Sequence, residues 1–273
     1  MKKIWNVFRA RFSISMKIYF RYPVNFIMTL FDPIIWLTPF YFMGKSFSSG
    51  GSVVGFERYT GNSDYMGFLI IGYMITSYVS TVFWTTGFSL KEEMRQGVLE
   101  SNWCAPVNKI VMLLSKTVFY FCATTFEIIL TFIVCRIAFG FKLSSDLFQA
   151  VGFLIPGIIG MIGIGMAVAA LVLVAKDANP IIDLVNSVLS ALSGSFFPVK
   201  VMSKGFLFVA LAIPLTYVYD SSRAILINQV PLFPLWQELI IIICAMFILC
   251  FVGSFIFIKV EKKCRSLGIL GTH

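Results

Sequence analysis

The chain has 273 residues, of which 58% are hydrophobic and only 13% are charged. This composition excludes an ordinary soluble domain of this length and indicates an integral membrane protein. The formal net charge of +9 fits a basic collar facing anionic lipid at the inner membrane surface, rather than a nucleic-acid site.

The first predicted element covers residues 1–22. Its apolar residues recur at helical spacing on one side: Ile4, Trp5, Phe8, Phe12, Met16 and Tyr19. Its basic residues gather toward another side: Lys3, Arg11, Lys17 and Arg21. This pattern predicts an amphipathic helix lying in the inner interface, with an ordinary basic tail as the alternative. Pro23 then permits a turn into the first span.

A membrane-spanning helix needs about 20 mostly apolar residues. Six stretches meet this need: 24–43, 65–87, 110–135, 148–175, 180–197 and 236–258. We therefore predict an all-α integral membrane protein with six transmembrane helices in a single domain, 1–273. With the N-terminus inside, the inner segments carry 15 Lys and Arg residues and the outer segments 7. The positive-inside rule thus places both termini in the cytoplasm.

Three predicted spans carry polar residues at spacings of three and four, which place each set on one helix face. The sets are Tyr73, Ser77, Ser80 and Trp84; Tyr120, Thr124, Glu127 and Thr131; and Asp183, Asn186, Ser190 and Gly194. Helix packing explains such faces, because small and hydroxyl residues let membrane helices approach and bond. The alternative is that some of these faces line a path through the membrane.

Glu127 is the most unusual of these polar residues. It precedes Arg136 by nine residues, or about 13 Å along a helix, so it lies deep in its span. A carboxyl group at that depth must be protonated, paired or hydrated. We expect a hydrogen-bonded structural acid near an inter-helix cavity. The alternative, a proton or cation relay, would need further acids in register, and Asp32 and Asp183 are the candidates considered for it.

Other patterns argue against a metal site, a disulfide framework or a nucleotide site in this chain. The single histidine is His273 and no CxxC pair occurs, so neither a metal site nor a disulfide framework is expected. The four glycines of GIIGMIGIGMAVAA in the fourth span predict close helix packing, since no Lys-Ser/Thr follows them as in a nucleotide loop. No GxxxxGK[ST] motif occurs. If ATP drives this protein, another subunit must bind it.

Two inserts interrupt the apolar sequence. KEEMRQGVLESNWCAPVNKIVMLLSK, residues 91–116, concentrates charge between two apolar runs, which predicts a helix that stands in water and contacts another protein. Residues 198–234 contain an apolar run that is too short to span and is broken by Pro214. This second insert predicts a membrane-dipping outer cap, with an ordinary outer loop as the alternative.

Both inserts resemble segments of type-2 ATP-binding-cassette (ABC) exporter permease subunits. The first resembles their first cytoplasmic loop, at Gly97, Leu99, Glu100, Pro106 and Lys116. The second resembles their segment between the last two spans, at Ser193, Gly194, Phe196, Phe197, Pro198, Pro214, Leu215, Thr216, Tyr217 and Arg223. The chain departs from the family pattern at Gln96, Asn102, Trp103, Ser115 and Ser203, which leaves the substrate open.

The resemblance implies the transmembrane permease of an exporter in a bacterial or archaeal plasma (inner) membrane. It implies a cytoplasmic ABC ATPase subunit that binds ATP and Mg, and a second permease copy or similar chain. It also implies a coupling helix at 91–104, with coupling residues Glu92, Glu93, Arg95, Gly97, Leu99, Glu100 and Pro106. The expected translocation path carries Ser77, Ser80, Trp84, Glu127, Asn186 and Ser190. The expected outer re-entrant cap carries Phe196, Phe197, Pro198, Pro214, Tyr217 and Arg223.

Three functions remain open from the sequence. The first is ATP-driven export of a hydrophobic or amphipathic small molecule, such as a drug, antibiotic or lipid-like compound. The second is export of a lipid-linked polysaccharide. The third belongs to another class, an ion-coupled carrier or channel that uses Glu127.

Overall fold

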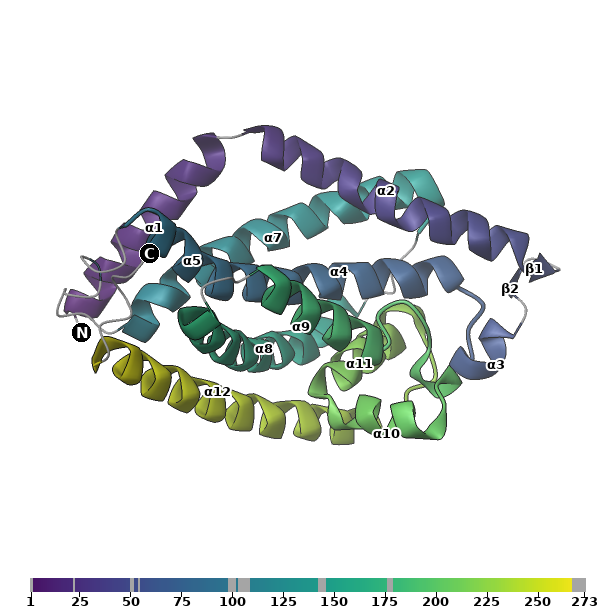
Figure 1. The fold of residues 1–273 in the computed structure, drawn as a ribbon. Helices are drawn as coiled ribbons and strands as arrows, with labels where there is room; N and C mark the ends of the chain where they lie inside the picture. Colours follow the sequence, from purple (N-terminus) through teal and green to yellow (C-terminus); the bar gives the residue numbers. More distant parts are fainter. Residues whose placement is uncertain are drawn as a thin grey trace.

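The computed structural model describes residues 2–21, 23–49, 52–53, 55–97, 102, 109–141, 146–175 and 179–266. Helices dominate these residues, and the strands among them form one short antiparallel hairpin, β1 (Ser48–Ser49) with β2 (Ser52–Val53) (Figure 1). Among the described residues, four helices are long and apolar enough to cross a membrane, or five if one bent pair counts as a span. The prediction of an all-α membrane protein is confirmed, and the predicted number of six spans exceeds this count.

Six helices in the described part of the chain have 19 residues or more. They are α1 (Lys2–Arg21), α2 (Pro23–Ser46), α4 (Tyr65–Phe83), α7 (Lys109–Phe139), α8 (Leu147–Ala175) and α12 (Leu235–Ser266). The predicted N-terminal helix is present as α1, and Pro23 begins α2 as expected. A five-residue helix, α3 (Phe56–Thr60), joins the hairpin to α4. Asp64 caps α4 by accepting a hydrogen bond from the Gly67 amide at 2.8 Å.

Helix α4 does not end where the sequence predicted its span to end. It continues through a π-helical turn, η1 (Trp84–Phe88), into α5 (Ser89–Arg95), and the run Tyr65–Arg95 counts as one 31-residue candidate span. At about 1.5 Å per residue this run is about 46 Å long, longer than the roughly 30 Å hydrocarbon core. Its charged end therefore extends beyond the hydrocarbon. Gly97, with φ +66°, ends the turn after α5.

Helices α8 and α12 lie side by side in close contact, as the glycine run predicted (Figure 1). A Cβ atom added at Gly163 of α8 would collide with the backbone of α12 at Leu249, and one added at Gly253 would collide with the backbone at Gly163. A Cβ atom added at Gly157 would meet the side chain of Val218 instead. The backbones of α8 and α12 can touch only because Gly163 and Gly253 carry no side chain.

The fifth predicted span, 180–197, is too long. Helix α9 (Asn179–Leu192) has 14 residues, which cover about 21 Å and fall short of the hydrocarbon core. It ends there because the following Gly194 adopts a left-handed backbone, with φ +78°. A 3-10 turn, η2 (Val199–Val201), comes next.

The segment predicted to form the outer cap, 198–234, contains two short helices, α10 (Lys204–Ala212) and α11 (Pro214–Ile227), bent by 89° relative to each other. The break falls at Pro214, as predicted, because proline suits the first position of a new helix and cannot continue the previous one. Asn228, with φ 57°, ends α11.

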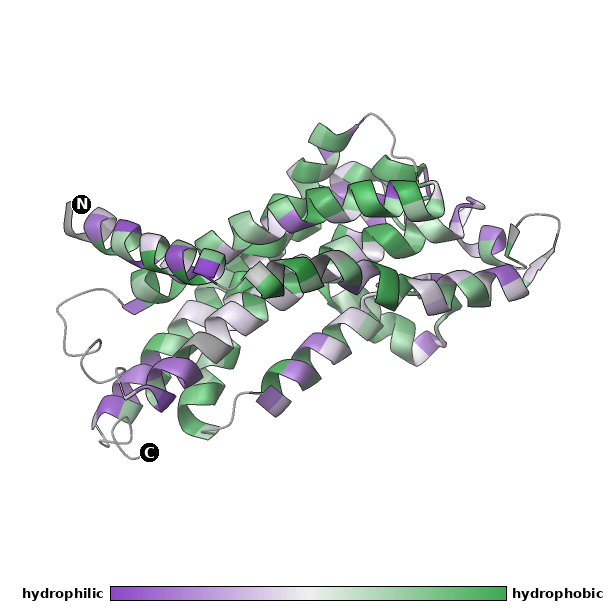
Figure 2. Cartoon of the chain, turned by 90° about the horizontal axis from the view of Figure 1, so that it is seen from above, coloured by the Kyte–Doolittle hydropathy of each residue, from purple (hydrophilic) through white to green (hydrophobic). Residues whose placement is uncertain are grey.

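The long helices are apolar along most of their length, and hydrophilic residues gather along α1 and near the end of the chain (Figure 2). Large apolar side chains are exposed on the outside of the helix bundle, including Ile137, Phe148 and Phe251. Exposed apolar faces of this extent indicate contact with lipid.

Candidate functional site

Two of the three predicted polar faces meet between α4 and α9. The Asn186 side-chain amide donates a hydrogen bond to Ser80 Oγ at 2.9 Å, and Asn186 Oδ1 lies 3.3 Å from the same hydroxyl. Both side chains are half-buried. A serine and an asparagine that satisfy each other inside apolar helices form a polar spot that stays accessible on one side.

The other residues on these faces have different surroundings. The Ser77 hydroxyl donates to the Tyr73 carbonyl of its own helix at 2.9 Å, so it is satisfied locally. Tyr73 itself donates to Asp32 of α2 at 2.7 Å. Ser190 is only 5% exposed and lies in packed protein. Trp84 opens the π-helical turn and lines a cavity of about 600 Å³.

A ladder of hydroxyl contacts joins α4 to α7. Its members are Tyr78 with Thr125 at 3.0 Å, Thr81 with Thr124 at 2.8 Å, and Thr85 with Thr117 at 3.4 Å. Only Thr124 was singled out from the sequence. Thr81 and Thr85 continue the spacing of four that begins with Tyr73 and Ser77, and this continuation was the available signal.

Glu127 has a hydrogen-bonding partner, as expected for a structural acid. The Tyr19 hydroxyl of α1 donates to Glu127 Oε1 at 2.5 Å. Burial raises the pKa of the Tyr19 phenol, and the hydrogen bond to Glu127 raises this pKa further. The phenol therefore stays protonated and remains a donor. Sequence reasoning missed Tyr19 as the partner, because it assigned that residue only to the apolar face of α1.

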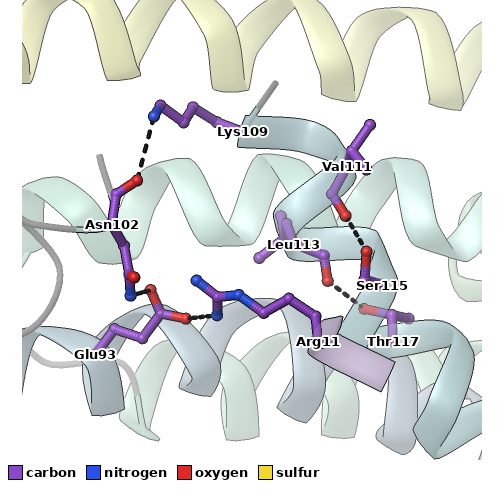
Figure 3. A network of polar contacts seen from close by, with 8 residues as sticks. All are labelled: Arg11, Glu93, Asn102, Lys109, Val111, Leu113, Ser115 and Thr117. Atoms are coloured by element: carbon purple, nitrogen blue, oxygen red, sulfur yellow. Dashed lines mark hydrogen bonds and ion pairs between the residues drawn. The ribbon is translucent and has the colours of Figure 1, made fainter. Parts of the chain in front are cut away.

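The charged insert forms a junction between α1, α5 and α7 (Figure 3). Arg11 Nη1 of α1 pairs with Glu93 Oε1 of α5 at 2.5 Å, and the Asn102 side-chain amide donates to Glu93 Oε2 at 3.1 Å. Lys109 at the start of α7 donates to the Asn102 carbonyl at 3.4 Å. Glu93 thus accepts from two different segments and ties them together.

The other acid of α5, Glu92, has its hydrogen-bonding partners in the same turn. Glu92 accepts from Arg95 at 2.9 Å and from Gln96 at 2.7 Å, on the more exposed side of the helix. Of the residues predicted to contact a partner, Leu99, Glu100 and Pro106 lie outside the described residues, and so does most of 98–108 within the predicted helix and loop.

Arg223 of α11 is 2% exposed, and it joins three parts of the chain. Its guanidinium donates to the carbonyls of Gly194 at 2.7 Å, Ser195 at 2.6 Å and Phe68 at 3.2 Å. The guanidinium carbon also lies 3.4 Å from the centre of the Phe68 ring. One side chain thereby joins α11 to α4 and to the turn after α9.

The other residues predicted for the cap lie near Arg223 in the sequence or in the fold. Phe196 stacks on Phe40 of α2 with ring centroids 5.5 Å apart, and Phe197 is 40% exposed. Pro198 precedes η2, and the Tyr217 hydroxyl donates to the Leu211 carbonyl at 2.7 Å across the bend at Pro214.

Sequence reasoning missed a buried acidic pair beside the cap. Asp220 accepts from the Gln229 side chain at 3.0 Å and from the Leu232 amide at 2.6 Å. Glu238 of α12 is fully buried and accepts from the Phe233 amide at 3.1 Å. The two acids hold the turn between α11 and α12. Their signal in the sequence was two carboxylates flanking the loop INQVPLFP.

Within the ranges that the structure describes, no group of three or more His, Cys, Asp or Glu side chains is placed to hold a metal ion. A family model described as "ABC-2 family transporter protein" matches residues 24–256. A search of curated proteins finds no match.

Proposed function

The chain belongs to the ABC-2 family of transporter proteins and is a membrane permease of an ABC transporter, and from this we propose that it serves an ATP-driven exporter. The cargo is a hydrophobic or amphipathic small molecule, a drug, antibiotic or lipid-like compound, moved out of the cytoplasm or inner leaflet. A separate ABC ATPase subunit binds ATP and Mg and hydrolyses ATP. The observation that carries the proposal is the continuous helix from Tyr65 to Arg95, which joins a membrane span to a charged end.

In this proposal α5 and the residues that follow it, over 91–104, form the coupling helix. Arg95 and Gly97 are exposed and Glu92 is half-buried beside them, and an ATPase groove can contact this part of the turn. Glu93 has a different role, because its contacts with Arg11 and Asn102 are inside the chain. It transmits movement of α5 to α1 and α7 as a rigid body. Leu99, Glu100 and Pro106 complete the proposed contact.

The proposed path runs along α4 and α9, where Ser80 and Asn186 meet. Two permease copies, or this chain with a similar one, place two such polar spots opposite each other. The proposed spans are α2, α4, α7, α8, α9 and α12, and α9 completes its crossing with the turn that follows it. Segment 198–234 is the proposed outer cap, with its 89° bend at Pro214. Both termini are proposed to be cytoplasmic.

The apolar cargo is preferred over a lipid-linked polysaccharide because aromatic side chains surround the proposed outer mouth. Phe196 stacks on Phe40, and Phe197 is partly exposed beside them. The ion-coupled alternative depends on Glu127. Its hydrogen bond to a phenol that stays protonated supports a structural role for this acid.

Charge exchange at α5 tests the ATPase contact. The double variant Glu92→Arg, Arg95→Glu exchanges the two charges of this pair and preserves the i,i+3 contact within the helix. Co-purification of the full chain with candidate ATPase subunits from the same genome should give a stoichiometric complex that this variant loses. The control Arg11→Glu, Glu93→Arg reverses the internal pair, and it should retain ATPase binding. Wild-type protein that binds no ATPase, or a variant that binds as well as wild type, would contradict the proposed coupling helix.

A further inference from the structure

The cavity beside α5 has a charged end and an apolar end. Its volume is about 600 Å³, and its walls come from α1, the run from α4 to α5, and α7. This volume is in the range of pockets that hold drug-sized ligands. Lys116, two turns into α7, forms part of the charged end. It lies about 10 Å along the helix from Lys109, where α7 begins, a depth that suits a lipid head group.

Within the described part of the chain, Lys116 is the cation of this cavity that forms no ion pair with a carboxylate. Arg11 pairs with Glu93, and Glu92 pairs with Arg95. Among the described residues, no hydrogen bond or ion pair reaches the Lys116 ammonium, although Glu93, Arg11 and Glu92 are its charged neighbours. A half-buried ammonium group gains most from an anion that enters the cavity.

The opposite end of the cavity opens onto an apolar helix face. Ile14 and Ile18 of α1 line it and are 55% and 50% exposed, and the half-buried Trp84 lies on the other wall. The two isoleucines are four residues apart, so they form one ridge along α1. An apolar chain that starts in the cavity can follow this ridge into the bilayer.

We propose that this cavity binds a membrane phospholipid, with its phosphate at Lys116 and an acyl chain along Ile14 and Ile18. A phosphodiester carries a single negative charge, which matches one unpaired ammonium group. The bound lipid fills the space beside the Arg11–Glu93 pair and braces α1 against α5. The proposal requires only that the chain lies in a membrane, and it is independent of ATP-driven export.

Native mass spectrometry of the full chain in detergent tests this binding. Titration with phosphatidylglycerol and with phosphatidylethanolamine should each leave one lipid bound, and diacylglycerol, which lacks phosphate, should bind at least ten-fold more weakly. Lys116→Gln should weaken binding of both phospholipids by ten-fold or more. The matched control Lys262→Gln, at an exposed lysine of α12, should leave binding unchanged. Equal binding of phospholipid by the Lys116→Gln variant and the wild type would overturn the proposal.

Two further arms use the wild-type chain, so they do not depend on the folding of a variant. Glycerol phosphate without acyl chains should not compete with the lipid, and full competition would indicate a site for free phosphate instead. A phosphatidylglycerol with a photoreactive group on its chain should label peptides of α1 and α7. Labelling confined to the exposed face of α12 around Phe251 and Phe255 would refute the assigned site.

Discussion

Replacing Arg223 by alanine should destabilise the protein more than any other single truncation of a charged side chain. The guanidinium makes three hydrogen bonds to carbonyls, two of them at 2.7 Å or less, and lies over the Phe68 ring. A hydrogen bond to a charged group contributes about 1.5–3 kcal/mol net, and a desolvated cation–π contact about 2 kcal/mol. The cost of burying the cation offsets part of this sum. We expect a net loss of about 4 kcal/mol.

The assay is thermal unfolding of the full chain in detergent, followed by size exclusion after heating. A loss of this size corresponds to a fall in Tm of roughly 8 °C or more, at about 2 °C per kcal/mol for a large chain. Arg223→Lys keeps the charge but reaches fewer carbonyls, so its Tm should lie between those of the wild type and the Arg223→Ala variant. Arg136→Ala, at an exposed arginine of α7, should change stability by less than about 0.5 kcal/mol. If the Arg223→Ala variant has the same Tm as the Arg136→Ala control, the hydrogen bonds of Arg223 do not stabilise segment 198–234.

Three further predictions follow from close contacts. Gly163→Val should reduce the yield of folded protein sharply, because its side chain would enter the backbone of α12, and an unchanged yield and Tm would show that α8 and α12 do not touch there. Glu127→Gln should keep wild-type stability and dye efflux from cells, because an amide oxygen still accepts from Tyr19. Glu127→Leu should lower the free energy of unfolding by about 1–2 kcal/mol. Lost efflux in a well-folded Glu127→Gln variant would favour the ion-coupled carrier. Asn186→Leu removes the partner of Ser80 and should reorder efflux across a panel of fluorescent amphiphiles, and an unchanged order would mean that this contact only packs helices.

Local patterns in the sequence predicted the parts of the fold that depend on local physics. Pro214 breaks the outer segment because its ring cannot continue a helix. The glycine run packs against α12 because backbones approach only where side chains are absent. The faces of Ser80 and Asn186 were assigned from periodicity, and the structure brings them together. Periodicity gives the direction of a side chain within its own helix.

Helix ends were predicted less well. The charges that begin at Lys91 suggested a separate loop helix, yet lysine, glutamate, methionine and arginine all favour helix, so α4 continues through η1 to Arg95. The fifth span was extended to 197 because its apolar composition continues, although Gly194 turns the backbone into a left-handed conformation. Hydropathy reports preference for the membrane and says little about where a helix stops.

Contacts between distant segments were outside the reach of the sequence. Arg223 binds carbonyls of residues 155 and 29 positions away, and backbone acceptors leave no signature in side-chain patterns. The pairing of Tyr19 with Glu127 spans 108 residues. The resemblance singled out Arg223 without its partners, and Asp220 and Glu238 had no assigned role. Their importance depends on burial, which only the packed helices define.

The contacts of the run from α4 to α5 explain how one helix can serve both ends of the molecule. Near its N-terminal end the Phe68 carbonyl accepts from Arg223, in its middle Ser80 bonds to Asn186 of α9, and at its charged end Glu93 pairs with Arg11 of α1. In the proposed coupling, a displacement of α5 would reach α9 and segment 198–234 along this run. The π-helical turn at 84–88 lies between the second and third of these attachments. Long helices kink at π-bulges, so this turn is where the run can bend while both of its ends remain attached.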